Sequence, residues 1–326
     1  MAPSSDGPPG GRVFSLEGRR APGLYLVAWV LSVGGVVLLF LAPRASSDVA
    51  RVGLIAVGAV SLMLGLAAAA GSQIVERRDR HPDRYRGPAP LLVFGVVLAA
   101  SSILSGLLLS SGLVDSETPF GFLLGLLLVA AGYALAVWLF AVRSDGLSWA
   151  EMGWPARAVT SIRDVLRSVG VAVAVMLPVA LGVLLLGGVL ASILDVEAPN
   201  VLPTPTTSLE AVAVALAVAV VAPIGEELFF RGFALSAWMK DLGARAAIGR
   251  SALFFALVHI VNITSVSFGE GAAQALLQTA AILPLGLVLG WLFVRHGMVG
   301  AIAGHITYNS FLLLLLLLST FLPEPA

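Results

Sequence analysis

Ionisable side chains inside apolar stretches are the best candidates for chemistry in this chain. The apolar stretch 209–231 contains two adjacent carboxylates and a guanidinium, at Glu226, Glu227 and Arg231. In a lipid environment each of these groups costs about 2.5–3.5 kcal/mol even on the mildest insertion scale, so each needs a structural or functional reason. A carboxylate in a dry setting is a suitable general acid or base.

Helix geometry assigns different roles to the two glutamates. Residues four apart share a helix face, so Glu227 can pair with Arg231, which lowers the cost of holding both charges in a dry setting. Glu226 points about 100° away and has no obvious local partner, which favours a catalytic role. A structural ion network, or a helix end at the membrane surface, explains the three residues equally well.

Two of the four histidines also lie inside apolar stretches, His259 at 251–263 and His305 at 298–321. Asn309 follows His305 by four residues and shares its face. A lone histidine in an apolar helix is more often a packed, hydrogen-bonded residue than a ligand. Here several polar residues coincide, and each would separately need a buried partner. We expect His81 and His296, which fall in loops, to be solvated.

Composition identifies the solvent around these groups. Of 326 residues, 58% are hydrophobic and only 12% are charged, and the mean hydropathy is +0.98. A soluble globule carries roughly 25% charged residues, so the composition predicts a membrane protein. The formal net charge of zero argues against nucleic-acid binding. The absence of cysteine excludes disulfides, thiol catalysis and cysteine-bound metals.

The apolar stretches predict an all-α, polytopic membrane bundle of about eight to nine transmembrane helices. Most have the roughly 17–25 residues that cross a bilayer, and none shows the alternation of a barrel strand. The stretch 251–263 is short and is the weakest candidate for a span. The first stretch is longer than the core of a signal peptide, so we expect it to remain uncleaved. The stretches are 24–41, 52–71, 90–113, 120–142, 169–193, 209–231, 251–263, 272–294 and 298–321.

The basic residues predict the orientation of the bundle. With the N-terminus inside and nine spans, sixteen of the nineteen lysines and arginines fall in cytoplasmic segments, as the positive-inside rule requires. His259 lies nine residues past Arg250 and His305 ten past Arg295, so both imidazoles are expected roughly 14–15 Å from the inner surface. Glu226 can reach the same depth. We therefore expect a cavity open to the cytoplasm that contains Glu226, His259, His305 and Asn309.

The regions of the chain differ in composition. Residues 1–20 are polar and predict a disordered cytoplasmic tail. Residues 21–165 predict N-terminal transmembrane helices of unknown role. Residues 166–322 form the expected core, with the motifs at 209–318. The inner segment 144–164, with Leu147, Trp149, Met152 and Trp154, is either a solvated loop or a piece lying among the lipid headgroups.

The order of the motifs resembles a known family. Glu-Glu-x-x-x-Arg, then Phe-x-x-x-His, then His-x-x-x-Asn resembles the CPBP intramembrane proteases, which include CAAX prenyl endopeptidases and bacterial proteins named for bacteriocin processing or immunity. Any one motif is weak, but three in order on successive apolar stretches are specific. The matching residues are Glu226, Glu227, Arg231, Phe255, His259, His305 and Asn309.

The resemblance implies a mechanism of peptide hydrolysis. Glu226 would activate water with help from His259, and His305 and Asn309 would stabilise the oxyanion or help bind a metal. Glu227, Arg231 and Phe255 would shape the site. A divalent metal such as zinc, held by Glu226, His259 and His305, and a metal-free glutamate-dependent route both fit these residues. There is no His-Glu-x-x-His, so a conventional zincin site is absent.

Three functions follow from these residues. The first is an intramembrane endopeptidase that hydrolyses a peptide bond of a membrane-associated peptide or protein, in the bacterial cytoplasmic membrane, with the lipid bilayer as its surroundings. The second is a non-catalytic immunity or regulatory protein, in which the polar cluster is structural. The third and weakest is an ion-coupled transporter, because buried Glu and His also form proton relays but no inverted repeat is visible.

Overall fold

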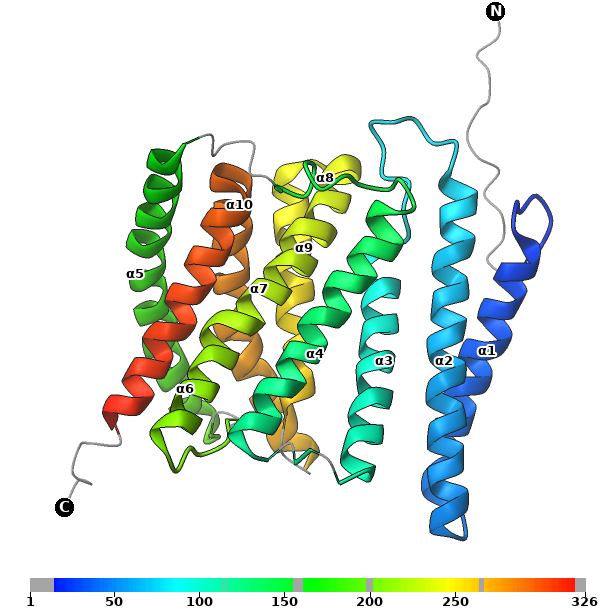
Figure 1. The fold of residues 1–326 in the computed structure, drawn as a ribbon, viewed down its shortest axis with the longest axis horizontal. Coiled ribbons are helices and arrows are strands. Elements are labelled where there is room, and N and C mark those ends of the chain that lie inside the picture. The colour runs from blue at the N-terminus through cyan, green and yellow to red at the C-terminus, as the bar shows by residue number, and fades with distance from the viewer. Residues whose placement is uncertain are drawn as a thin grey trace, which may run out of the picture. The chain divides into compact units, whose positions relative to one another are not determined.

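The structure is a computed structural model that describes residues 15–112, 114–115, 117–154, 161–197, 202–263 and 267–319. Every element in these ranges is helical, which confirms the all-α expectation for them (Figure 1). Eight helical stretches of 18 to 49 residues are long and apolar enough to cross a membrane. Large hydrophobic side chains cover their outer faces, as lipid contact requires. The chain is therefore a polytopic, integral membrane protein.

The last of these stretches, α10 (Phe268–Ser319), reverses its direction. Gly297 has φ 66° and ψ −163°, which interrupts the helix. Gly304 lies against Leu292, where an added Cβ would come within 2.7 Å of the leucine Cδ1. In a straight helix twelve residues span about 18 Å, so the parts before and after Gly297 must lie side by side. We call them the first and second arms of α10, and they correspond to the last two of the nine predicted spans.

The described residues divide into two compact units. Unit 1 contains those up to Leu107 together with Trp138–Gly146, and unit 2 contains Leu108–Val137 and everything from Leu147 onward. All residues of the three sequence motifs belong to unit 2, and so does the fourth helix up to Val137. The candidate site can therefore be described within this unit alone.

Unit 1 is built on a tightly packed helix pair, α1 (Pro22–Leu41) and α2 (Asp48–Arg77), followed by most of α3 (Pro90–Ser110). Gly35 and Gly58 form the contact between α1 and α2. A Cβ on Gly35 would lie 2.7 Å from the carbonyl oxygen of Gly58, so a larger residue there would separate the two backbones.

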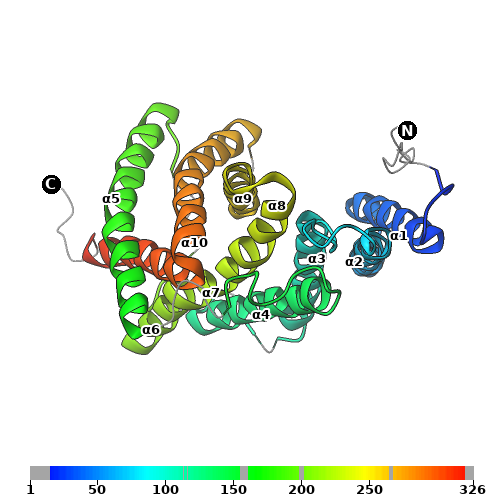
Figure 2. The ribbon, with the colours of Figure 1, turned by 90° about the horizontal axis from the view of Figure 1, so that it is seen from above.

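Unit 2 consists of one long helical run and four other helices that pack around it. This run is α6, α7 and α8, which are joined end to end by two π-helical turns and are seen as one run beside α9 in Figure 2. The elements of the unit are α4 (Pro119–Val137), α5 (Ile162–Leu194), α6 (Ser208–Leu216), α7 (Ala222–Glu227), α8 (Ser236–Leu242), α9 (Ala244–Val258) and α10.

Capping residues define where two of these helices begin. Ser161 and Asp164 form a reciprocal capping box at the start of α5, and Thr207 and Glu210 form another at the start of α6. As a result α5 begins at Ile162, seven residues before its apolar stretch. Part of the predicted inner loop is therefore helical, because the cap supplies the hydrogen bonds that begin a helix in a polar stretch.

Of the predicted inner segment 144–164, the structure describes residues 144–154 and 161–164, and residues 147–154 belong to unit 2. Leu147 and Met152 are 2% and 0% exposed, whereas Trp149 and Trp154 are 39% and 40% exposed. Burial of the two aliphatic side chains argues against a freely solvated loop and agrees with a segment at the membrane surface. The remainder of the predicted segment at 155–160 lies outside the described residues.

Candidate active site

The motif helix changes its winding on both sides of the two glutamates. Glu226 and Glu227 lie on α7, preceded by a π-helical turn at Ala217–Val221 and followed by another at Leu228–Leu235. Such turns are rare and occur mainly as short insertions at functional sites, because they rotate the following residues and disturb the regular backbone bonds. No pattern in the sequence predicted them.

Carbonyl groups of these two turns accept hydrogen bonds from neighbouring helices. Asn309 on α10 donates its amide Nδ2–H to the carbonyl oxygen of Val218 at 2.8 Å. Ser251 on α9 donates its hydroxyl to the carbonyl oxygen of Phe230 at 3.0 Å. The altered winding therefore gives α9 and α10 polar attachment points on either side of α7, which fixes the position of the glutamates relative to both helices.

Glu227 and Arg231 form a fully buried ion pair. Arg231 Nη1 lies 2.8 Å from Glu227 Oε1, and both side chains are 0% exposed. The guanidinium also donates Nη2–H to the carbonyl oxygen of Gly286 at 3.3 Å and lies 4.3 Å above the ring of Phe255. The pair predicted from the four-residue spacing is thus present, and it is joined to both α9 and α10.

Close packing at Gly286 supports this arrangement. A Cβ on Gly286 would lie 3.0 Å from the Cα of Ala252, so only glycine lets α10 approach α9 this closely. The approach brings the Gly286 carbonyl within reach of Arg231. A carbonyl that accepts from a buried guanidinium compensates part of the cost of taking that charge out of water.

His305 connects the two glutamates. Its Nδ1 lies 2.8 Å from Glu227 Oε1, and its Nε2 lies 3.7 Å from Glu226 Oε2. Because an ionised carboxylate only accepts, the Nδ1 atom must carry the hydrogen of the shorter bond. The neutral ring therefore presents an unprotonated Nε2 towards Glu226. Glu227 was expected only to shape the site, but here it also determines the orientation and tautomer of His305.

Glu226 is the accessible carboxylate of the pair. Its side chain is 22% exposed, against 0% for that of Glu227. Adjacent residues point about 100° apart, so Glu227 lies in the buried ion pair while Glu226 reaches a partly exposed position on the other side of His305. The sequence argument treated both glutamates as buried and did not predict this difference; the catalytic role of Glu226 stays a prediction.

His259 occupies the end of α9, where the helix tightens into a 3₁₀ turn. Its Nδ1 lies 2.7 Å from the carbonyl oxygen of Phe255, an acceptor, so Nδ1 carries the hydrogen of this bond, and in the neutral ring Nε2 is an acceptor. The Phe255 ring lies between the two histidines, with centroids 4.6 Å from His259 and 5.8 Å from His305. Phe255 therefore holds both imidazoles, in addition to covering Arg231.

A residue outside the motifs also borders the site. Tyr133 on α4 is 8% exposed, and its ring centroid lies 4.8 Å from that of Phe229. The ring also lies beside Gly225, next to Glu226 in the chain, where an added Cβ would be 3.7 Å from Tyr133 Cδ2. The contact depends on Gly225, whose added Cβ would lie 2.8 Å from the Cβ of Ala130 on α4. Sequence reasoning missed Tyr133, and its only signal was a phenol inside an apolar stretch.

The geometry also bears on how the expected metal ligands are arranged. In the part of the chain that the structure describes, no three His, Asp or Glu side chains are grouped so that they could hold a metal ion. Both histidines present a free Nε2, but Glu226, His259 and His305 do not converge on one point in this arrangement. These residues therefore do not form a ready three-ligand centre, and we derive no step through a metal.

The part of the chain that carries the three motifs matches a known protein family. Residues 208–311, about a third of the chain, match the family model described as Type II CAAX prenyl endopeptidase Rce1-like. No curated protein and no solved structure matches the chain. The matched range begins with α6 and includes the motif helix, α9 and the second arm of α10 as far as Phe311. Residues 208–311 are thus an Rce1-like CAAX prenyl endopeptidase domain, which indicates an intramembrane protease of the CPBP type.

Proposed function

We propose that the chain hydrolyses a peptide bond of a membrane-associated substrate with Glu226 as the general base. The observation that carries the proposal is the ordered series Arg231, Glu227, His305 and Glu226. In it a buried ion pair holds an imidazole, and the imidazole faces an accessible carboxylate. A general base needs to be both positioned and reachable by water, and Glu226 meets both conditions.

The chemical steps follow from these positions. Glu226 accepts a proton from a water molecule while the water oxygen forms a bond to the carbonyl carbon of the scissile peptide. The electron pair of the C=O bond moves to its oxygen and creates an oxyanion. When the C–N bond breaks, Glu226 returns the proton to the departing nitrogen. The free Nε2 of His259 serves as an additional acceptor that orients the attacking water.

Asn309 and His305 supply the oxyanion donors. One Nδ2 hydrogen of Asn309 is used on Val218, and the second is available for the substrate oxygen. His305 can donate through Nε2 only as an imidazolium, since its neutral form carries the hydrogen on Nδ1. Preorganised donors of this kind typically contribute 10²–10³ in rate each.

We place the site on the cytoplasmic side of the membrane. At one end of the unit, the last turn of α8, the first half of α9 and the chain just before Gly297 carry Lys240, Arg245, Arg250 and Arg295. The positive-inside rule puts such an end in the cytoplasm. The substrate then reaches Glu226 from that side.

The proposal is tested by cleavage of a library of membrane-tethered peptides by the purified full chain. We expect Glu226→Gln, which keeps the shape and removes the base, to lower kcat by about 10²–10⁴. The matched control is Glu197→Gln, because Glu197 is an exposed carboxylate of the same unit. Equal cleavage by wild type and Glu226→Gln would remove Glu226 from the reaction. Absence of cleavage by the wild type would instead favour a regulatory or immunity protein whose polar cluster is structural.

A further inference from the structure

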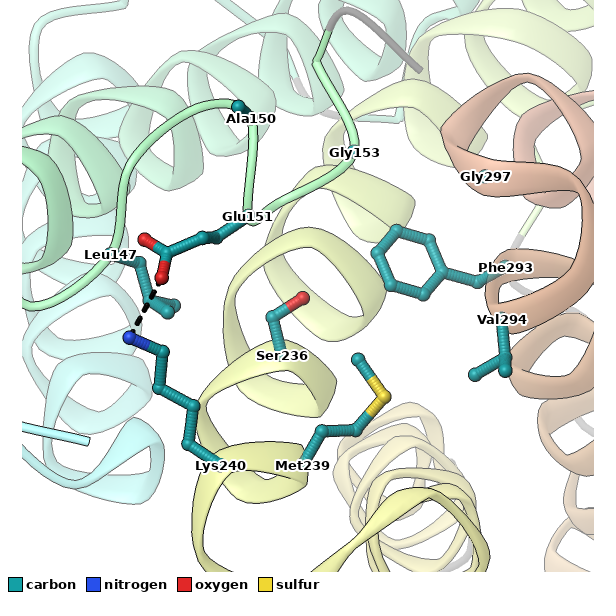
Figure 3. A pocket seen from close by; sticks show the side chains of 10 residues that line it. All are labelled: Leu147, Ala150, Glu151, Gly153, Ser236, Met239, Lys240, Phe293, Val294 and Gly297. Atoms are coloured by element: carbon teal, nitrogen blue, oxygen red, sulfur yellow. Dashed lines mark ion pairs between the residues drawn. The ribbon is translucent and has the colours of Figure 1, made fainter. Parts of the chain in front are cut away.

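A cavity lies in unit 2, away from the glutamates. Its volume is about 420 Å³, and it is formed by the 147–153 segment, by α8 and by the end of the first arm of α10. Ser236, on its wall, lies ten residues beyond Glu226 along the motif helix, which corresponds to about 15 Å. Glu151 and Lys240 lie on one side of the cavity, and Phe293 lies across from them (Figure 3).

Tryptophans mark the membrane depth of this cavity. All four tryptophans of unit 2 lie on the three segments that form it, or within two residues of their lining positions. Trp149, Trp154 and Trp291 are 39%, 40% and 40% exposed. Half-exposed tryptophans beside basic residues are typical of the headgroup layer. The cavity therefore lies where phospholipid headgroups meet the protein.

The two charged side chains of the cavity form an ion pair. Lys240 Nζ lies 2.8 Å from Glu151 Oε1, with side chains 21% and 35% exposed. The other oxygen of Glu151 accepts from the backbone N–H and the hydroxyl of Ser148 at 2.7 and 2.8 Å. The lysine ammonium has three N–H donors, and this ion pair occupies one of them. The cavity therefore offers a cation and an anion side by side, with no net charge.

This pairing determines which ligand fits. An anion that approaches Lys240 also approaches Glu151, so attraction and repulsion largely cancel. A headgroup that carries both charges gains from each partner. The opposite wall is apolar at Met239 and Phe293, which suits the beginning of an acyl chain rather than a free ion.

We propose that this cavity binds the headgroup of a zwitterionic phospholipid. The lipid phosphate accepts hydrogen bonds from Lys240, the lipid ammonium lies beside Glu151, and the glycerol end of the chains lies against Met239 and Phe293. Such a lipid bridges the 147–153 segment and α8, since each supplies one of the two charges. The inference is independent of the proposed peptidase function.

The test uses the full chain in detergent, with lipid binding followed by native mass spectrometry and by the shift of the melting temperature. The probes are phosphatidylethanolamine, phosphatidylglycerol and soluble phosphoethanolamine. We expect wild type to bind phosphatidylethanolamine about three-fold or more tightly than phosphatidylglycerol. Soluble phosphoethanolamine should have little effect, because it lacks the apolar part. Tighter binding of phosphatidylglycerol, or an equal shift with phosphoethanolamine, would overturn the proposal.

Variants connect the binding to the two charges. Glu151→Gln leaves the charge of Lys240 uncompensated, so this variant should bind phosphatidylglycerol more tightly than phosphatidylethanolamine. Lys240→Gln should weaken the binding of both lipids. The charge exchange Glu151→Lys with Lys240→Glu retains a pair and guards against loss of folding. It should keep the zwitterionic preference. Arg245→Gln, which removes an exposed charge of the same end outside the cavity, is the control. An unchanged preference in Glu151→Gln would contradict the proposal.

Discussion

His305 donates its Nδ1–H to Glu227 across 78 positions of sequence, over a distance of 2.8 Å, and this bond directs the other ring nitrogen towards Glu226. The glutamate adjacent to the proposed base therefore acts on the reaction indirectly, by fixing the tautomer of a histidine. The same oxygen of Glu227 also accepts from Arg231. A change at Glu227 should consequently affect both the stability of the fold and the peptidase activity. Suitable variants should separate the two effects.

Replacement of Glu227 by Gln should destabilise the protein strongly. Arg231 would remain fully buried without its counter-charge, and breaking a buried pair in this way costs about 3–5 kcal/mol. The double variant Glu227→Leu with Arg231→Met removes both charges and should recover much of the loss. It should remain inactive, because His305 has lost its orienting partner. Thermal unfolding and peptide cleavage measured on the same preparations check both statements. Recovery of activity in the double variant would contradict the role of Glu227.

Asn309→Ala should lower kcat by about 10²–10³, with a smaller effect on KM, because an oxyanion donor acts mainly in the transition state. It also removes the bond to Val218 that attaches α10 to the π-helical turn. The control is Thr307→Val, on the same helix, because the Thr307 hydroxyl donates to the carbonyl oxygen of Ala303 in the preceding turn of its own helix. Steady-state kinetics on one peptide substrate compares them. Similar losses in both variants would assign the effect to helix packing instead.

Gly286→Ala should destabilise the site by about 1–3 kcal/mol through overpacking. The new methyl group would lie 3.0 Å from the Cα of Ala252 and force α10 away from α9, which lengthens the bond from Arg231 to the Gly286 carbonyl. Gly249→Ala on α9 is the matched control, since nothing lies within 4 Å of its added Cβ. Melting temperatures of the two variants should differ clearly. Equal melting temperatures of the two variants would show that the contact between Gly286 and Ala252 is not tight.

The ion pair of Glu151 predicts a pH-dependent contribution to stability. Burial acts to raise the pKa of Glu151, but hydrogen bonds from Lys240 and Ser148 outweigh it and lower the pKa to about 2 from its ordinary value of 4.5. A lowered carboxyl pKa stabilises the folded state above pH 4.5, and this contribution disappears as the pH falls towards 2. The melting temperature of Glu151→Gln should therefore lie below that of wild type at pH 5–7. The melting temperatures of the two proteins should become equal in acid. A difference that persists at pH 2 would contradict the assignment of this contribution to the Glu151 carboxylate.

Removal of metal ions should leave peptide cleavage intact. In the described residues, the carboxylate and histidines of the site are not grouped to hold an ion, and the proposed steps use only protein groups and water. Activity measured after extensive chelation, together with the metal content of the active protein, checks this. Loss of activity that zinc restores would replace the proposed route by a metal-dependent one.

Particular residues illustrate how far sequence reasoning reached. The pairing of Glu227 with Arg231 followed from their spacing, because helix geometry alone relates residues four apart. The membrane depth expected for His259 and His305 rests on their distances along the chain from Arg250 and Arg295, and it stays a prediction. The contact of Tyr133 with the site was not predictable, because it depends on close approach of two helices at Gly225. The ion pair of Glu151 with Lys240 was not predictable either, because no local rule relates a loop to a helix 89 positions later.

The sequence by itself determined the membrane environment, the helical class and the identity of the polar residues. Those properties depend on composition and on local periodicity, which can be read one stretch at a time. Only the tertiary structure decided which glutamate is accessible, which nitrogen of His305 faces it, and that π-helical turns attach α9 and α10 to the motif helix. These features depend on how helices pack against one another, and packing is a property of the whole unit that no single stretch contains.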